Sequence, residues 1–253
     1  MQFGAAAEHY DRFMGRYTPG LAVGLADAAG VRPGMCVVDV GCGPGGLTRE
    51  LVARAGAENV AAIDPAPQFV RACRDRNPGA DVQVGTAEQL PWAAGRFDAA
   101  LSCLVIGFMR DPDRGVREMA RVTRPGGTVA ACMWDVVDGM TMLRTFWTAV
   151  GRVDPSSQGE RGMAGTRKGD IAERFERAGL EGVVDGVLTS HADYRDFDDF
   201  WEPFTLGVGP AGQYLSSLPA ESRERVRDAC REALPDGPFT LDARAWCARG
   251  TVP

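Results

Sequence analysis

The chain has 253 residues, which is enough for one large domain or two small ones and for a substantial hydrophobic core. Its hydrophobic residues make up 45% and its charged residues 25%, and its net charge of −6 argues against a general attraction to nucleic acid or to an anionic membrane. It contains no apolar stretch of membrane-spanning length and no N-terminal secretion signal, so we expect a cytoplasmic protein with neither nucleic acid nor membrane as a partner.

The seven cysteines give little indication of a disulfide framework or a metal site. Their number is odd, and no two of them form a C-x-x-C pair. Several lie in or beside apolar runs, where thiols usually pack as small core residues. We therefore expect reduced thiols in the cytosol and no bound metal.

Short apolar runs alternate with helix-like segments through the first 135 residues. Strands are expected at 36–40, 59–63, 81–84, 97–102 and 127–134, and helices near 47–56, 67–76 and 113–123. The Arg-Pro-Gly-Gly at 124–127 is expected to form a turn before the fifth strand. This alternation predicts an α/β fold with a parallel sheet covered by helices on both faces. Right-handed crossovers bring the carboxyl ends of such strands to one edge, where we expect a ligand to bind.

The second half of the chain is less regular. Helices are expected at 139–151 and 171–180, the second ended by Gly179, and strands at 183–190 and 239–248. The roughly forty residues between those two strands are too apolar for a linker and too few for an independent domain, so we expect a lid over the sheet edge. The predicted organisation is a single domain over 1–253, with a cofactor-binding half at 1–135 and lid or substrate insertions at 136–168 and 195–236.

A glycine-rich loop follows the first predicted strand, in VVDVGCGPGG at 37–46. Gly41, Gly43 and Gly46 fit the G-x-G-x-x-G pattern of a dinucleotide-binding loop, where the absence of Cβ atoms lets the backbone approach a ligand. The glycines alone leave a nicotinamide or flavin cofactor open. Asp39 favours another ligand, because an anion is unfavourable beside a pyrophosphate and suits an ammonium group such as that of S-adenosylmethionine.

The same loop resembles the first motif, D-x-G-x-G-x-G, of the class I S-adenosylmethionine-dependent methyltransferases. The likeness covers residues 8–135 and continues in order through AAIDPAPQF, VGTAEQLPWAAGRFDAALSCLVIGFM and REMARVTRPGGTVAACMW. Within that family, the sequence is similar to the branch that includes quinone-biosynthesis and small-molecule methyltransferases. The resemblance implies a Rossmann-like, seven-stranded, mostly parallel sheet with an antiparallel C-terminal strand pair and helical lid insertions. It also implies methyl transfer from S-adenosylmethionine to a small-molecule acceptor, with S-adenosylhomocysteine as product.

Two residues near the end of the second strand are candidates for the adenosine site. Asp64 lies 21 positions after Gly43, a spacing that suits a carboxylate accepting both ribose hydroxyls. The alternative is a helix cap for the segment that starts at Pro65. Phe69 follows one turn later, either against the adenine face or in the core.

The resemblance also implies an adenine contact after the third strand, where the family often has Asp-Ala. Thr86 replaces that acid here, so its hydroxyl or Glu88 takes the contact, while the backbone N–H of Ala87 still donates to the ring. At the end of the fourth strand, Cys103 is expected to contact the methionine part through its backbone and not to act as a nucleophile. The expected cofactor-binding residues are Tyr17, Asp39, Gly41, Cys42, Gly43, Asp64, Pro65, Phe69, Thr86, Ala87, Glu88 and Cys103.

The sequence identifies no catalytic residue, and His191 and Tyr17 are only candidates. The N-terminal AAEHYDRFMGRYTPG resembles a helix that closes over the cofactor, where Tyr10 and Tyr17 lie against it and Arg16 meets its carboxylate, or where they simply pack. An apolar or aromatic acceptor is expected beside some of five aromatic residues, namely Trp134, Trp147, Trp201, Phe204 and Tyr214.

Two other functions stay open. One is an NAD(P)-dependent oxidoreductase, which the glycines support but Asp39 and the lone Lys168 oppose. The other is a non-catalytic S-adenosylmethionine-binding protein. The acceptor, the O-, N- or C-type of methylation and the oligomeric state are not fixed by the sequence.

Overall fold

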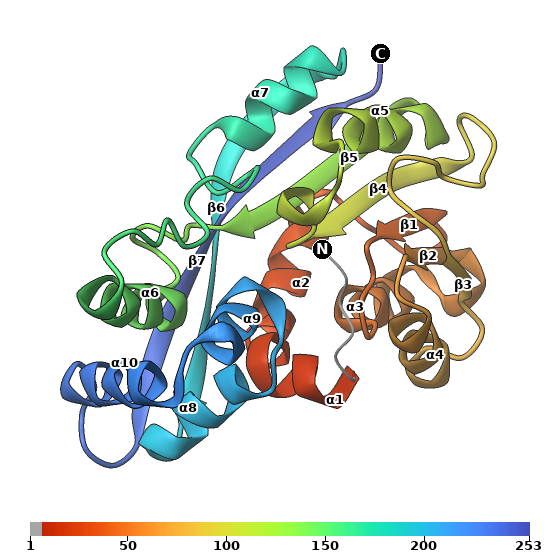
Figure 1. The fold of residues 1–253 in the computed structure, drawn as a ribbon. Coiled ribbons are helices and arrows are strands. Elements are labelled where there is room, and N and C mark those ends of the chain that lie inside the picture. Colours follow the sequence, from red (N-terminus) through yellow and green to blue (C-terminus); the bar gives the residue numbers. More distant parts are fainter. Residues whose placement is uncertain (1–6) are drawn as a thin grey trace.

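The computed structural model describes residues 7–253 and is built around one seven-stranded sheet of order β3-β2-β1-β4-β5-β7-β6 (Figure 1). The strands are β1 (Val37–Val40), β2 (Val60–Asp64), β3 (Asp81–Val84), β4 (Phe97–Cys103), β5 (Thr123–Trp134), β6 (Glu181–Tyr194) and β7 (Phe239–Thr251). Strands β1 to β5 pair in parallel, whereas β7 runs antiparallel to both β5 and β6. The predicted fold class, with its antiparallel C-terminal pair, is confirmed.

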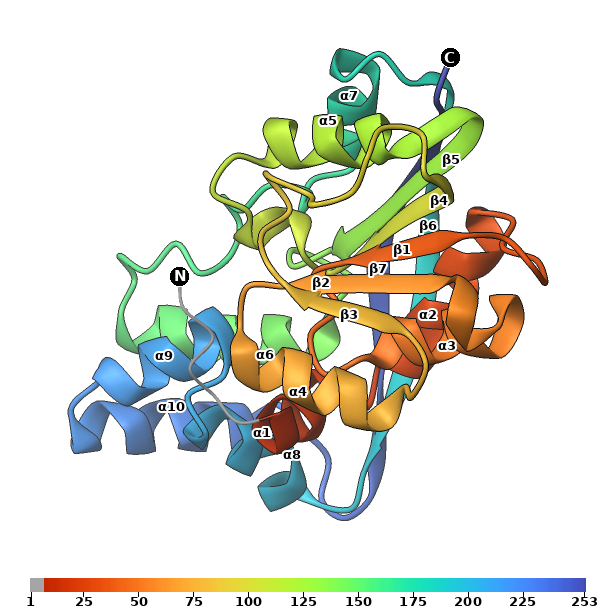
Figure 2. The same ribbon diagram turned by 90° about the vertical axis from the view of Figure 1, so that its right-hand side faces the viewer.

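Helices cover both faces of this sheet. They are α1 (Ala7–Tyr10), α2 (Thr18–Ala28), α3 (Gly46–Ala55), α4 (Pro67–Arg76), α5 (Pro112–Val122), α6 (Thr141–Val153), α7 (Asp170–Arg177), α8 (Phe197–Thr205), α9 (Gly209–Ser217) and α10 (Ala220–Glu232). Figure 2 shows α5 and α7 on one side of the sheet and α2, α3 and α4 on the other. Successive side chains of β1 point to opposite faces of the sheet, so each face has its own hydrophobic core. Val37 packs in the core under α2 and α3, and Val38 packs in the core under α5 and α7.

The start of β5 differs from the prediction. Residues 124–127 were expected to form a separate turn, but they continue the strand, and the pairing of β5 with β4 shifts in register between Phe97 and Ala99. Gly126 has a φ of +74°, which favours glycine. The Pro-Gly-Gly signal therefore marks an irregularity inside a strand and not a break before it.

The second insertion leaves and rejoins the sheet at neighbouring points. It comprises α8, α9 and α10 between the end of β6 and the start of β7, where Tyr194 pairs with Phe239. Helix α10 lies beside α6, so the two insertions pack on one another (Figure 1). None of the helices within 7–253 has both the length and the apolar character needed to cross a bilayer.

Candidate functional site

A cavity of about 1540 Å³ lies at the carboxyl ends of the parallel strands. Its wall follows one strand after another, with Asp39 of β1, Asp64 of β2, Thr86 after β3 and Cys103 of β4. Strands β2 and β4 flank β1 on opposite sides, so this edge is the topological switch point at which α/β folds bind ligands. Pockets for one drug-sized ligand measure roughly 300–1,000 Å³, so the cavity has room for two molecules.

The glycine loop between β1 and α3 shapes the floor of the cavity. Gly41 has a φ of +81°, and a Cβ there would lie 2.4 Å from the Val105 side chain. This glycine therefore allows the loops after β1 and β4 to touch. Gly43 has a φ of +52°, and a Cβ there would meet no atom within 4 Å. Because Gly43 lines the cavity, the open space beside it is space that a ligand can fill.

Asp39 is fully buried and carries an unpaired oxygen. Its Oδ2 accepts a hydrogen bond from Thr48 Oγ1 at 2.7 Å, whereas its Oδ1 has no partner among the residues described. Burial raises the pKa of Asp39 to about 7, and the hydrogen bond from Thr48 only partly opposes this rise. A buried carboxylate oxygen without a partner is costly, so this site fits a ligand that brings a cation or a hydrogen-bond donor.

Asp64 ends β2 and organises the backbone around it. Its Oδ2 accepts from the N–H of Gly43 at 3.0 Å, and its Oδ1 accepts from the N–H of Ala66 at 2.8 Å. Burial raises its pKa in spite of these two hydrogen bonds. The side chain does not cap α4, which starts at Pro67 without a side-chain cap. Each carboxylate oxygen retains a second lone pair, so both can still accept from ligand hydroxyls.

The expected adenine region is only partly as predicted. Phe69 is buried and lines the cavity beside Tyr10, their ring centroids 5.6 Å apart. Glu88 also lines the cavity, but its Oε1 accepts from the backbone N–H of Arg110 at 2.7 Å. Burial acts to raise the pKa of Glu88 but is outweighed by hydrogen bonds from backbone N–H groups and from Thr86, so the pKa is lowered. Glu88 thus secures the loop after β4. Pro65, Ala87 and Cys42 also line the cavity.

The end of β4 holds a residue that the sequence did not single out. Leu104 lines the cavity with a φ of +63°, a conformation that is rare for a bulky side chain. Its N–H donates to the carbonyl of Cys132 at 2.9 Å, which fixes it in place. Such strain is concentrated at ligand sites. Cys103 lies in the same wall, its Sγ 3.6 Å from that of Cys132.

Of the residues considered at the N-terminal segment and for catalysis, Arg16 lines the cavity, whereas Tyr17 and His191 do not. Tyr17 is fully buried, with its hydroxyl oxygen 2.8 Å from that of Tyr194, because α2 turns this side chain toward the core. Arg16 contributes to the cavity wall, with its guanidinium paired to Asp199 at 3.2 Å. His191 is exposed on β6 and does not line the cavity. Neither candidate for a catalytic base is therefore part of the cavity wall.

The remaining wall is mostly apolar and comes from the N-terminal segment and from both insertions. Phe13, Leu143 and Val208 contribute to it. Of the five aromatic residues expected there, Trp134 is in the wall, while Trp147, Trp201, Phe204 and Tyr214 pack outside it. Glu160 is an unexpected member, since its carboxyl group is buried in this apolar region. No local pattern in the sequence marks it, because it lies in a polar, glycine-rich segment.

The comparison with protein families gives a match to a methyltransferase domain over residues 38–131. A 2-methyl-6-phytyl-1,4-hydroquinone methyltransferase from rice (Oryza sativa subsp. japonica) is 32% identical over 149 residues, which are 58% of this chain and 39% of that protein. An uncharacterized methyltransferase of Mycobacterium tuberculosis is 36% identical over 153 residues, 60% of each chain. The match therefore spans less than two thirds of either relative.

Two further matches extend over most of the chain. An uncharacterized protein of Mycobacterium tuberculosis is 37% identical over 241 residues, 89% of this chain and 85% of that protein. Among solved structures, a putative methyltransferase from Bacillus halodurans has a TM-score of 0.58 at 19% identity, covering 92% of this chain and 98% of its own. This last likeness is one of fold.

Proposed function

Because the chain belongs to the class I S-adenosylmethionine-dependent methyltransferases, we propose that it transfers a methyl group from S-adenosylmethionine to a small-molecule acceptor with an apolar or aromatic body. The observation that carries the proposal is the unpaired Oδ1 of buried Asp39 beside the glycine loop. It suits the ammonium group of the cofactor and does not suit a pyrophosphate.

The chain's residues have distinct tasks in this proposal. Asp39 binds the ammonium group, Asp64 accepts from the ribose hydroxyls, and Phe69 lies against the adenine. The space beside Gly43 admits the cofactor close to the backbone. The bound cofactor supplies a sulfonium-activated methyl group, so the protein needs chiefly to align the acceptor and exclude water.

The acceptor occupies the apolar part of the same cavity. Residues 136–168 and 195–236 contribute to its walls through Leu143 and Val208, and Phe13 and Trp134 complete them from the first half of the chain. The cofactor side is the half at 1–135. The seven cysteines are all free thiols, which supports work in the reducing cytoplasm.

An oxidoreductase gains no support from the site. Lys168 is exposed and does not line the cavity, so it cannot serve a nicotinamide there.

The test is calorimetric titration of the purified protein with S-adenosylhomocysteine and with NADH, followed by a methyl-transfer assay over phenol, amine and activated-carbon acceptors. We expect S-adenosylhomocysteine alone to bind and at least one acceptor class to be methylated. Binding of NADH alone would contradict the family's chemistry at this site. Binding without transfer to any class would make the protein a non-catalytic binder.

A further inference from the structure

Glu160 presents a carboxyl oxygen to the acceptor side of the cavity. The residue is 4% exposed and lines the cavity. Its Oε1 accepts from the indole N–H of Trp147 at 3.2 Å, and no residue in the described chain bonds to its Oε2. The only fully buried side-chain oxygen without a partner in 7–253 is Asp39 Oδ1, so Glu160 Oε2 keeps access to the cavity.

The segment that carries Glu160 lies over the carboxyl end of β5. Gly165 packs against Met133, and Gly107, which follows β4, packs against Ala164 and Met133. Trp134 ends β5 and is itself in the cavity wall. The segment of Glu160 thus lies beside the carboxyl ends of β4 and β5, which are across β1 from β2 and β3, where the candidate adenosine residues lie.

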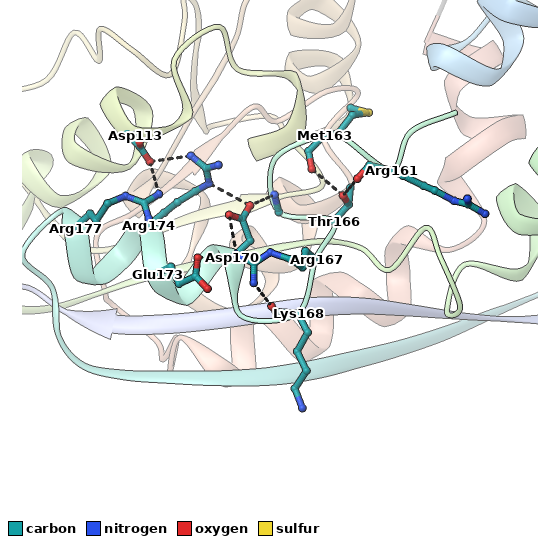
Figure 3. A network of polar contacts seen from close by, with 11 residues as sticks. Asp113, Arg161, Met163, Thr166, Arg167, Lys168, Asp170, Glu173, Arg174 and Arg177 are labelled. Carbon is teal, nitrogen blue, oxygen red and sulfur yellow. Dashed lines mark hydrogen bonds and ion pairs between the residues drawn. The ribbon is translucent and has the colours of Figure 1, made fainter. Parts of the chain in front are cut away.

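A network of polar contacts fixes this segment to two helices (Figure 3). The N–H of Gly165 donates to Asp170 Oδ2 at 2.5 Å, and buried Thr166 donates to a carbonyl of its own segment at 2.7 Å. Arg174 then joins Asp170 of α7 at 3.2 Å to Asp113 of α5 at 2.8 Å. The chain that directly follows Glu160 is therefore fixed to α5 and α7, while the carboxyl group itself is held by Trp147.

The charge state of Glu160 suits proton transfer near neutral pH. Burial raises its pKa to about 7, and the hydrogen bond from Trp147 partly opposes the rise. The titratable groups of its own segment are Asp154, Arg161, Arg167 and Lys168, those of α6 are Arg144 and Arg152, and α9 adds Tyr214. None of these charged groups contributes to the shift. A general base works best when its pKa is near the working pH.

We propose that Glu160 is the general base of the reaction and that the acceptor is an apolar molecule bearing a phenolic hydroxyl, an inference that rests on the methyltransferase function proposed above. Oε2 accepts the hydroxyl proton while the acceptor oxygen forms its bond to the methyl carbon. The carbon–sulfur bond breaks with its electron pair on sulfur, so the positive sulfonium and the negative carboxylate are both neutralised. A neutral hydroxyl enters this apolar region at lower cost than an ammonium group.

The first test measures transfer from S-adenosylmethionine to a series of para-alkylphenols and alkylhydroquinones, with the corresponding anilines for comparison. We expect the wild-type protein to methylate phenols. Glu160→Gln, which keeps a hydrogen-bond acceptor but no base, is expected to lower kcat at least about 100-fold with KM within about threefold. Glu176→Gln, an exposed glutamate of α7, is the matched control and should keep wild-type values.

The second test uses the pH profile. The wild-type rate is expected to rise with pH through about 7, as Glu160 loses its proton. Trp147→Phe removes the hydrogen bond that lowers the pKa of Glu160, so its profile should move to higher pH, which a purely structural defect would not produce.

The outcomes separate the two proposals. If S-adenosylhomocysteine fails to bind, the methyltransferase function itself is wrong. If the wild-type protein binds S-adenosylhomocysteine but does not methylate phenols, the proposal for Glu160 is wrong. It is also wrong if Glu160→Gln binds S-adenosylhomocysteine within about twofold of wild type and keeps the wild-type kcat, or if the pH profile of Trp147→Phe does not move. Methylation of the anilines alone would overturn the phenolic acceptor.

Discussion

Thr48 Oγ1 lies 2.7 Å from Asp39 Oδ2, so the hydroxyl occupies one oxygen of a buried carboxyl group, while the other oxygen, Oδ1, has no partner among the residues described. The hydroxyl fixes the rotation of the carboxyl group without supplying the positive charge that burial calls for. In our proposal the cofactor's ammonium group supplies that charge.

Replacing Asp39 by Asn should therefore separate binding from stability. We expect Asp39→Asn to weaken S-adenosylhomocysteine binding at least about tenfold at pH 8, since a charged partner of the ammonium group is lost. In the wild type, affinity should fall as the pH drops below about 7, where Asp39 takes up a proton. Calorimetry from pH 6 to 8.5 measures both effects, and equal affinities for variant and wild type would assign Asp39 a structural role.

Without ligand, Asp39→Asn should be more stable than the wild-type protein at neutral and higher pH. The pKa of Asp39 rises from 3.8 to about 7 on folding, so its stabilising contribution is full below pH 4 and is lost as the pH rises toward 7. A shift of this size corresponds to roughly 4 kcal/mol. Melting temperatures at pH 5 and pH 8 should show Asp39→Asn gaining on the wild type as the pH rises, and a parallel pair of curves would contradict the shift.

In our proposal Asp64 accepts from the ribose hydroxyls, and in the structure it also accepts from two backbone N–H groups. Asp64→Ala should lower cofactor affinity more than tenfold and also cost about 1–3 kcal/mol of stability, because the N–H groups of Gly43 and Ala66 lose their acceptor. Asp64→Asn keeps one acceptor oxygen and should lose affinity with a smaller loss of stability. Calorimetry and thermal melts of both variants measure the two effects separately. Unchanged affinity in Asp64→Ala would show that Asp64 only stabilises the loop backbone and does not bind the cofactor.

Gly43→Val tests the open space beside the loop. The new side chain would enter the cavity from a backbone with φ of +52°, so we expect S-adenosylhomocysteine binding to disappear while circular dichroism stays close to wild type. Gly34→Val is a matched control, since Gly34 also has a positive φ, of +81°, with open space around it but lies outside the cavity wall. Binding that survives in Gly43→Val would mean that the loop is only a turn.

Trp201 is a core residue in this structure. It is 8% exposed, stacks on Phe197 with centroids 6.2 Å apart, and packs on Phe204 outside the cavity wall. Trp201→Ala should cost about 3–5 kcal/mol and lower the melting temperature clearly, with S-adenosylhomocysteine affinity of the folded protein within about twofold. A stable variant with impaired methyl transfer would instead return Trp201 to the acceptor pocket.

Local sequence signals predicted the framework of the site but not its acceptor side. The strands were recognisable because parallel strands are buried on both faces and read as continuous apolar runs, and Asp39 was conspicuous inside one of them. The sequence could not predict the partner of Tyr17, because Tyr194 is 177 residues away and contacts it only through the packing of α2 on β6. The aromatic residues of FDDFWEPF at 197–204 follow helical spacings of three and four, which indicate a buried stripe but not what covers it. Glu160 is buried only because residues 161–170 fold back on α7 and β5, a long-range arrangement with no local pattern.

The insertion between β6 and β7 is in effect an enlarged hairpin loop, since Tyr194 and Phe239 are directly paired and their rings stack 5.3 Å apart. Both of its ends are therefore anchored within one ladder step, and the entropic cost of closing such a loop depends only weakly on its length. Evolution or protein engineering can therefore replace the whole of 195–238 by another insertion while the register of β5, β7 and β6 is kept. Val208 leaves with that segment and Asp39 does not, so under the proposed assignment new acceptor preferences can be introduced without changing the cofactor-binding residues.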